Sequence, residues 1–330
     1  MMEGLITGKR EGMMSNRIHR RDFLKKGALM GLGAAVGGPI FSQRAMEASS
    51  YIWNGQLPDI SVAAGNDFFA STLKAVEFLG GMEKFVPSGA RVALLPNVQR
   101  WNPGTFTKPE ILRAVIQMCR RSGAAEVNVL SWLEQKNWEE TGLASVIREE
   151  GAALKRIPRE EADFQTVKVS GGVAMKDAMI MKEFFNNDIF IDMPITKDHA
   201  GNKFTGTMKN LMGINFPTHN RSNFHKPNWT TDPEAIRHLD RCIVDLNTVA
   251  KPSLCVVDAT EFIITNGPMG PGELIQPHKV VAGVDRVAID TYCTTLWDVE
   301  ARNVTQIVEA DKRGLGTMDL TKVRITEQTL

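Results

Sequence analysis

The feature that most constrains this chain is a regular alternation, after residue 49, of short β-branched runs with segments of helical periodicity. Such alternation is typical of a largely parallel sheet covered by helices. It predicts strands at 60–64, 91–95, 126–130, 155–157, 166–169, 189–193, 254–258 and 280–284. It predicts helices at 68–79, 109–121, 143–150, 179–185, 233–249, 286–297 and 304–313. We therefore expect an α/β fold with a mixed, largely parallel sheet in Rossmann-like layers, forming one domain over residues 49–330.

The first 48 residues have a different pattern, a basic stretch followed by an uncharged run from 27 to 43. The basic stretch matches the twin-arginine export motif S/T-R-R-x-F-L-K, with His19 in place of the usual Ser or Thr, through Arg20, Arg21, Phe23, Leu24 and Lys25. The uncharged run is short and weakly apolar for a transmembrane span. We predict a signal peptide over residues 1–48, cleaved after Ala48, and export by the twin-arginine (Tat) translocase to the periplasm. An uncleaved signal would instead tether the protein to the membrane, and it is the only membrane contact that we expect.

The charge of the chain changes when this segment is set aside. The whole sequence has 39 Lys and Arg against 38 Asp and Glu, a net charge of +1. Eight of the basic and four of the acidic residues lie in the first 48, so residues 49–330 carry 31 against 34, a net charge of −3. A protein held on nucleic acid by phosphate contacts would be strongly basic. We therefore expect no nucleic-acid partner.

The richest polar segment directly follows the apolar strand at 189–193, where open α/β sheets place their ligands. Lysine and backbone groups in such a segment bind carboxylates or phosphates, and histidine acts as an acid, a base or a metal ligand. A solvated basic loop is the alternative. We predict that His199 and Lys209 are catalytic and that ligand contacts come from the other polar residues there, Lys197, Asn210, His219 and Arg221. No zinc-binding spacing is present, so the metal ligands are left open.

Polar residues also follow other predicted strands. Asn97 comes after the strand at 91–95, and Asn266 and Gly267 lie in a turn-forming segment after the strand at 254–258; we predict all three as ligand contacts. Asp258 ends that strand, and it is predicted either as a catalytic general base or metal carboxylate or as a structural residue.

Two helix starts have recognisable capping patterns. Thr107 and Glu110 predict an N-cap and a capping box for the helix at 109–121. Asp285 is the predicted N-cap of the helix that follows it.

The four cysteines are Cys119, Cys242, Cys255 and Cys293. They are too few and too dispersed for a disulfide framework or a ferredoxin-type cluster motif. We expect buried thiols, which is the usual state of a free cysteine. The alternative is a redox protein that binds an iron–sulfur cluster through these four residues.

Several motifs, in order, resemble the family called domain of unknown function 362. They are Pro-Asn at 96–97, T-x-P-E at 107–110, G-A-x-E-V at 123–127, P-x-x-K-x-H at 194–199, T-G-x-x-K-N-x-x-G at 205–213, N-G-P at 266–268 and G-x-D-x-V-A-x-D at 283–290. Leu95 departs from the family pattern, which usually has lysine there. The resemblance covers roughly residues 60–326 and implies an α/β domain, but it implies no reaction. Some relatives carry a ferredoxin-like module whose cysteines this chain lacks.

These observations lead to two principal hypotheses. The first is an exported enzyme, linked to a metal or cofactor of unknown identity, that acts on a small anionic ligand in a cleft at the strand ends. The second is a non-catalytic periplasmic binding or assembly factor for a redox complex.

Overall fold

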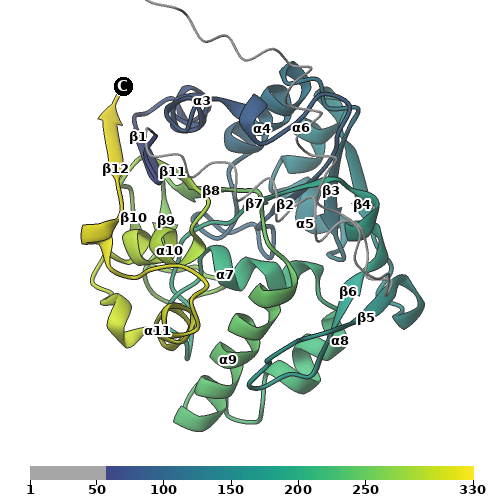
Figure 1. Ribbon diagram of the computed structural model, residues 1–330, viewed down its shortest axis with the longest axis vertical. Coiled ribbons are helices and arrows are strands. Elements are labelled where there is room, and N and C mark those ends of the chain that lie inside the picture. The colour runs from purple at the N-terminus through teal and green to yellow at the C-terminus, as the bar shows by residue number, and fades with distance from the viewer. Residues whose placement is uncertain (1–56) are drawn as a thin grey trace, which may run out of the picture. The chain divides into compact units, whose positions relative to one another are not determined.

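The computed structural model describes residues 57–330. The predicted signal peptide, with Arg20 and Arg21, lies outside the described residues, so export and cleavage after Ala48 stay predictions. Within the described part, eight strands form one sheet in the order β12-β1-β11-β8-β7-β2-β3-β4 (Figure 1). The strands are β1 Ile60–Ala64, β2 Arg91–Pro96, β3 Glu126–Ser131, β4 Ala153–Arg156, β7 Ile189–Met193, β8 Leu254–Ala259, β11 Lys279–Gly283 and β12 Ile325–Thr329.

The sheet is mixed and mostly parallel, as predicted. β11 pairs antiparallel with both of its neighbours, β1 and β8, and the other pairs in the sheet are parallel. Two small sheets accompany it: β5 Phe164–Lys168 with β6 Asp177–Met181, and β9 Phe262–Ile263 with β10 Leu274–Ile275.

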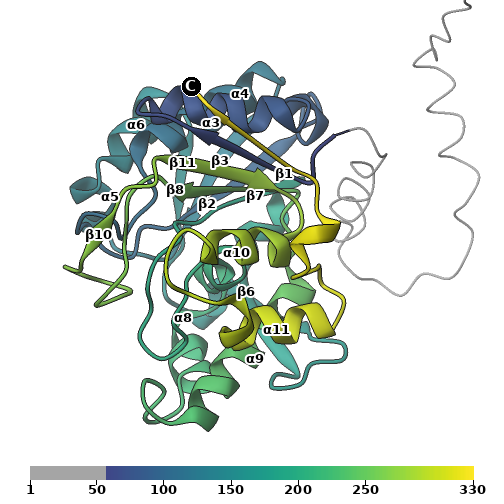
Figure 2. The same ribbon diagram turned by 90° about the vertical axis from the view of Figure 1, so that its left-hand side faces the viewer.

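Helices cover both faces of the large sheet (Figure 2). α3 Phe68–Phe78, α4 Pro109–Arg121 and α6 Leu143–Glu149 pack on one face, and α9 Pro233–Val249, α10 Arg286–Thr294 and α11 Thr305–Lys312 pack on the other. Side chains of a strand alternate between the two faces. In β2, Val92 and Leu94 accordingly join the first core, and Ala93 and Leu95 join the second. The shorter helices α5 Gln135–Glu140, α7 Thr207–Asn210 and α8 Pro217–His219 lie in the loops.

The strongly periodic segments fold as predicted. α4 has Pro109 in its first turn and buries Ile111, Leu112, Val115 and Ile116, which the sequence spaces along one face. Asp285 is confirmed as the N-cap of α10, because its Oδ1 accepts hydrogen bonds from the backbone nitrogens of Val287 and Ala288. The four cysteines are free and fully buried.

The helix predicted at 179–185 is wrong. Residues 177–181 form β6, followed by a short 3₁₀ helix at Lys182–Asn186. Met179 is held on both edges of its strand, by Thr166 in β5 on one side and by Asn215 and Phe216 on the other. Two sets of backbone hydrogen bonds from distant segments therefore override the local helical pattern.

The capping box predicted at Thr107 is also wrong. The N-cap of α4 is Lys108, and no side chain caps it. The hydroxyl of Thr107 instead donates to the Met193 carbonyl oxygen at 2.6 Å and accepts from the Asn97 backbone nitrogen at 3.0 Å. Thr107 thus ties together the ends of β2 and β7, beside which a cleft opens.

In residues 57–330, no helix has both the length and the apolar character that a membrane crossing requires.

Candidate functional site

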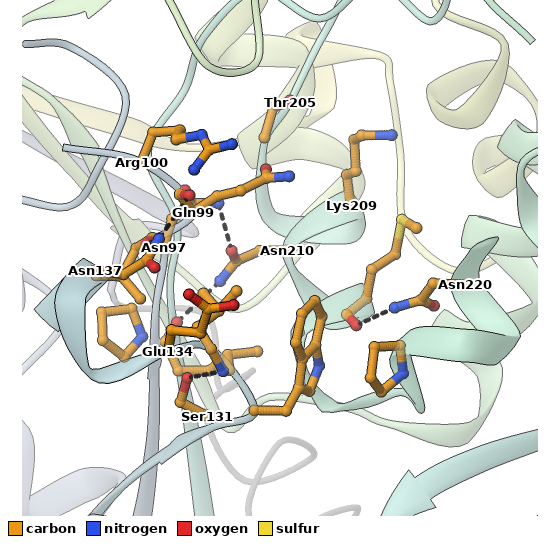
Figure 3. Close-up of a pocket in the computed structure, with 18 of the residues that line it drawn as sticks. Asn97, Gln99, Arg100, Ser131, Glu134, Asn137, Thr205, Lys209, Asn210 and Asn220 are labelled. Carbon is orange, nitrogen blue, oxygen red and sulfur yellow. Dashed lines mark hydrogen bonds between the residues drawn. The ribbon is translucent and has the colours of Figure 1, made fainter. Parts of the chain in front are cut away.

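A cleft of about 500 Å³ lies at the carboxyl ends of β2, β3 and β7. Most of its lining comes from three chain segments: 95–100 at the end of β2, 130–134 at the end of β3, and residues between 199 and 225 that follow β7. Asn137, Arg159 and Met269 add further side chains, the last from the loop between β9 and β10. Figure 3 shows Arg100 and Lys209 on opposite sides of one end of this cleft, with Ser131 and Glu134 toward the other end. The cleft is therefore at the place where open α/β sheets bind ligands.

Lys209 is the central cation of the cleft. Its side chain comes from α7 and is 7% exposed. Its Nζ donates to Asn202 Oδ1 at 3.1 Å, and Asn202 Nδ2 donates to Asp240 Oδ1 at 2.7 Å. Burial lowers the pKa of Lys209 to about 8, partly opposed by the Asp240 carboxylate. Within residues 57–330, no carboxylate oxygen lies within 4.0 Å of this ammonium group, so its charge is available to a ligand.

Lys197 lies directly behind the cleft lining and is fully buried. Its Nζ donates to the Thr105 carbonyl oxygen at 2.6 Å and to Asn97 Oδ1 at 3.1 Å. Burial, and next the positive charge of Lys209, lower the pKa of Lys197 to about 7. Its partners are neutral oxygens, so it adds positive potential to the cleft when protonated.

Two asparagines connect this lysine to the cleft wall. Asn97 Nδ2 donates to Asn210 Oδ1 at 2.9 Å. Asn210 Nδ2 in turn donates to the Leu95 carbonyl oxygen at 2.9 Å and to Asp192 Oδ1 at 2.7 Å. Both amides are thereby held in one orientation.

His199 and His225 line the cleft beside Lys209 and both approach the ring of Trp229. His199 Nδ1 lies 2.7 Å from the Ala200 carbonyl oxygen, and His225 Nδ1 lies 2.8 Å from the Asn220 carbonyl oxygen. A carbonyl oxygen only accepts, so Nδ1 carries the proton and Nε2 is left with its lone pair. Burial lowers the pKa of both histidines. The pKa of His199 falls well below its ordinary value, because the positive charge of Lys209 adds to the effect of burial. Both rings are therefore neutral proton acceptors near pH 7.

The remaining charges also favour an anion. Arg100, Arg159 and Arg221 line the cleft, and Glu134 is the one acidic residue among its described lining residues. Arg159 lies 3.6 Å from Glu134, which offsets that carboxylate. The cleft is thus rich in cations and amide groups, which are the groups that bind carboxylates and phosphates.

The structure brings together five of the predicted site residues in the cleft lining: Asn97, His199, Lys209, Asn210 and Arg221. Lys197 does not line the cleft, but it donates a hydrogen bond to Asn97, which does. The other four predicted residues do not line the cleft, and they are Asp258, His219, Asn266 and Gly267.

Asp258 is separated from the cleft by the chain that follows β7. Residues 194–196 pair with the end of β8. The Thr196 nitrogen donates to the Asp258 carbonyl oxygen at 3.0 Å, and the Asp258 nitrogen donates to the Pro194 carbonyl oxygen at 2.8 Å. The carboxylate accepts hydrogen bonds from the Lys108 nitrogen at 2.8 Å, and from the Thr260 nitrogen at 3.0 Å and hydroxyl at 2.6 Å. These contacts give Asp258 a structural position.

The turn residues are likewise held by the protein itself. Asn266 Nδ2 donates to the Pro271 carbonyl oxygen at 3.1 Å, and the Gly267 nitrogen donates to Asp198 Oδ2 at 2.7 Å. His219 is half-buried on α8, and burial lowers its pKa.

Several lining residues were not predicted as ligand contacts from the sequence, namely Gln99, Arg100, Glu134, Asn137, Arg159, Asn220 and Met269. A signal existed for 99–100 and 131–134, because both segments follow predicted strands at the same sheet edge. Arg159 had no such signal. Its Nε reaches the Trp132 carbonyl oxygen at 3.0 Å from a loop after β4.

His199 and His225 are the two histidines that line the cleft. Across residues 57–330, no three or more His, Cys, Asp or Glu side chains are grouped so as to hold a metal ion. The cationic lining fits an anionic molecule, whether substrate or cofactor.

Comparison with known proteins places these features in a family. A curated relative, the thylakoid-associated protein sll1697 of Synechocystis sp. (strain ATCC 27184 / PCC 6803 / Kazusa), is 26% identical over 264 residues, which are 77% of each chain. Among solved structures, the lactate racemase apoprotein from Thermoanaerobacterium thermosaccharolyticum matches with a TM-score of 0.43 and 13% identity, over 59% of this chain. The match spans about half (49%) of the length of that racemase. The model of the family described as Domain of unknown function (DUF362) matches residues 92–295, which include every lining segment of the cleft and more than half of the sequence. The chain belongs to the DUF362 family.

Proposed function

We propose that this protein is a Tat-exported periplasmic enzyme that binds a small organic anion in the cleft and transfers a proton to or from it through His199. The observation that carries the proposal is the position of Lys209. Its buried ammonium group faces neutral Asn202 and lies among other cations. A buried charge is costly unless it is paired, and Asn202 stands between Lys209 and the Asp240 carboxylate, so a bound anion supplies a direct partner.

The binding step follows from the charges of the cleft. A carboxylate or phosphate at Lys209 forms charge-assisted hydrogen bonds, which are shorter and stronger than neutral ones. Arg100 and Arg221 add to the positive potential at the opening. An anionic cofactor would meet the same groups as an anionic substrate, and a metal ion carried with it would meet the imidazoles of His199 and His225.

The proton step follows from the state of His199. Its fixed Nδ1 proton and low pKa leave Nε2 unprotonated near neutral pH, as a general base requires. A bound anion offsets the Lys209 charge that lowers this pKa, so binding itself brings the imidazole closer to a range useful for proton transfer.

The experiment is calorimetric titration of the full chain at pH 7 with phosphate, acetate, succinate and citrate. We expect at least one of these anions to bind and Lys209→Met to weaken its affinity tenfold or more. The matched control is Lys312→Met, which removes an exposed lysine of α11 outside the cleft and should leave the affinity unchanged. Equal affinities of the unmodified chain and Lys209→Met would refute the proposal.

Proton transfer is tested separately. Titration in two buffers of different ionisation enthalpy should reveal proton uptake on binding at pH 7.5, reduced in His199→Gln. Chemical conversion of the bound ligand is monitored by mass spectrometry. Tight binding without any conversion would support the non-catalytic binding protein instead.

A further inference from the structure

We propose that the ligand of this cleft is a carboxylate with an apolar body several carbons long, whose charge lies at Lys209 and whose hydrocarbon part contacts Trp132, Leu133 and Met212. This inference deepens the proposed function and rests on it. It is carried by the volume of the cleft and by the apolar side chains that share its lining with unpaired cations.

The volume exceeds what a bare oxyanion needs. About 500 Å³ lies within the roughly 300–1,000 Å³ typical of pockets for small organic molecules. An inorganic ion or acetate held at Lys209 would leave the remainder of the cleft to water. A larger organic ligand uses the whole space.

Part of the lining is apolar and firmly supported. Trp132, Leu133 and Met212 are half-buried, so each keeps surface to offer to a ligand. Trp132 and Met212 pack on one core of the domain, and Leu133 packs on the other. Within the lining, a Cβ added to Gly213 would lie 3.2 Å from Leu95 Cδ1, which shows how closely these two lining residues approach each other. Such a preformed wall binds hydrocarbon without reorganising.

The charges beside Trp132 are paired with each other, unlike Lys209. The Arg159 guanidinium lies 5.5 Å from the centre of the Trp132 ring and 3.6 Å from Glu134. Arg100, Lys209 and Arg221 have no carboxylate within 4.0 Å in the described residues. In Figure 3 the labelled cations Arg100 and Lys209 lie toward one end of the cleft, and Ser131 and Glu134 lie toward the other. A ligand with one anionic end and an apolar body matches this division.

The side chain of Gln99 adds a polar contact between Arg100 and Lys209. It is exposed, lines the cleft and extends toward its middle in Figure 3. It is suited to a single hydroxyl or carbonyl group on the ligand body.

The experiment compares acetate, hexanoate, phenylacetate and the neutral methyl ester of phenylacetate by calorimetry on the full chain at pH 7. We expect hexanoate and phenylacetate to bind at least tenfold more tightly than acetate, because apolar surface leaves water. We expect the methyl ester to bind at least tenfold more weakly than phenylacetate, because it lacks the charge for Lys209. Met212→Gln should reduce the advantage of hexanoate over acetate about threefold, whereas Met212→Leu, which keeps an apolar side chain of similar size, should preserve it.

The two levels of inference fail differently. Acetate or phosphate binding as tightly as hexanoate would overturn the apolar-body inference and leave anion binding intact. An ester binding as tightly as the acid would overturn the placement of the charge. Absence of binding by every anion would overturn both. The ligand series is measured on the unmodified chain, so the inference is decided even where a Met212 variant does not fold.

Discussion

The ammonium group of Lys197 donates a hydrogen bond to Asn97 Oδ1 at 3.1 Å, and so determines which way that amide faces. With its oxygen turned to Lys197, Asn97 presents Nδ2 to Asn210, and Asn210 presents its own Nδ2 to Leu95 and Asp192. The chain of contacts ends at a fully buried carboxyl group whose pKa is raised well above its ordinary value, chiefly by burial. Lys197 is therefore a positioning residue for the cleft wall.

The stability contribution of Lys197 should depend on pH in a definite direction. Its pKa is about 7 in the folded protein, below the ordinary value of 10.5, so between these values the unfolded chain binds more protons than the folded one. Stability then rises with pH through this window. We expect unmodified protein to gain stability relative to Lys197→Met between pH 7 and pH 10, measured by urea unfolding at several pH values. A difference between the two proteins that does not change with pH would contradict this assignment.

Anion affinity should fall as Lys209 loses its proton. Its pKa is about 8, and simple carboxylates stay ionised throughout the neutral and alkaline range. Because a bound anion raises this pKa, we expect the loss of affinity to begin above pH 8 and to approach tenfold by pH 10. Calorimetric titration with the best-binding carboxylate checks it. Lys209→Met should remove this part of the pH dependence.

Asp245 should be a major stabilising residue. It is fully buried on α9, accepts hydrogen bonds from the backbone nitrogens of Val173, Ala174 and Met175, and pairs with Arg313 at 2.7 Å. Asp245→Ala leaves these donors without their acceptor, and we expect a loss of about 2–4 kcal/mol of unfolding free energy. Urea unfolding measures it, and the exposed Asp298→Asn is the control. A loss no larger than that of the control would contradict this prediction.

Asp258→Asn should affect folding more than ligand binding. Its carboxylate accepts three hydrogen bonds from Lys108 and Thr260 and lies outside the cleft. An amide places a donor where an acceptor is needed, which should cost about 1–3 kcal/mol of unfolding free energy. Anion affinity of the folded variant should stay within about twofold of the unmodified protein. A tenfold loss of affinity in a well-folded variant would restore Asp258 to the catalytic role suggested by the sequence.

Export should depend on the paired arginines. Replacing both Arg20 and Arg21 by lysine keeps the charge but removes the motif that the translocase reads. In a bacterial host with this translocase, we expect the unmodified full-length chain in the periplasmic fraction and the double variant in the cytoplasm. Arg17→Lys, outside the motif, is the control. Periplasmic recovery of the double variant would contradict Tat export.

The strongly periodic elements were predictable from local sequence. The strands at 60–64 and 189–193 and the helices at 109–121 and 233–249 have the predicted bounds. The helices repeat their apolar residues at helical spacing along one buried face, and the strand at 189–193 is a short apolar run that is buried on both faces, so local pattern and global burial agree. The polar segment around Lys209 was also predictable, because the edge of a parallel sheet at which the strands end is where its loops gather.

Tertiary structure alone decided the rest. Met179 lies in a strand because two segments distant in sequence flank it: β5 pairs with β6 on one side, and Asn215 and Phe216 hydrogen-bond to the Met179 backbone on the other. Asp258 is withheld from the cleft because residues 194–196 pair with the end of β8, and Arg159 enters it because its side chain reaches Trp132. A local sequence pattern specifies which face of an element is apolar, but it does not specify which distant backbone supplies the hydrogen-bond partners. Those partners determine which strand-end loops share one cleft.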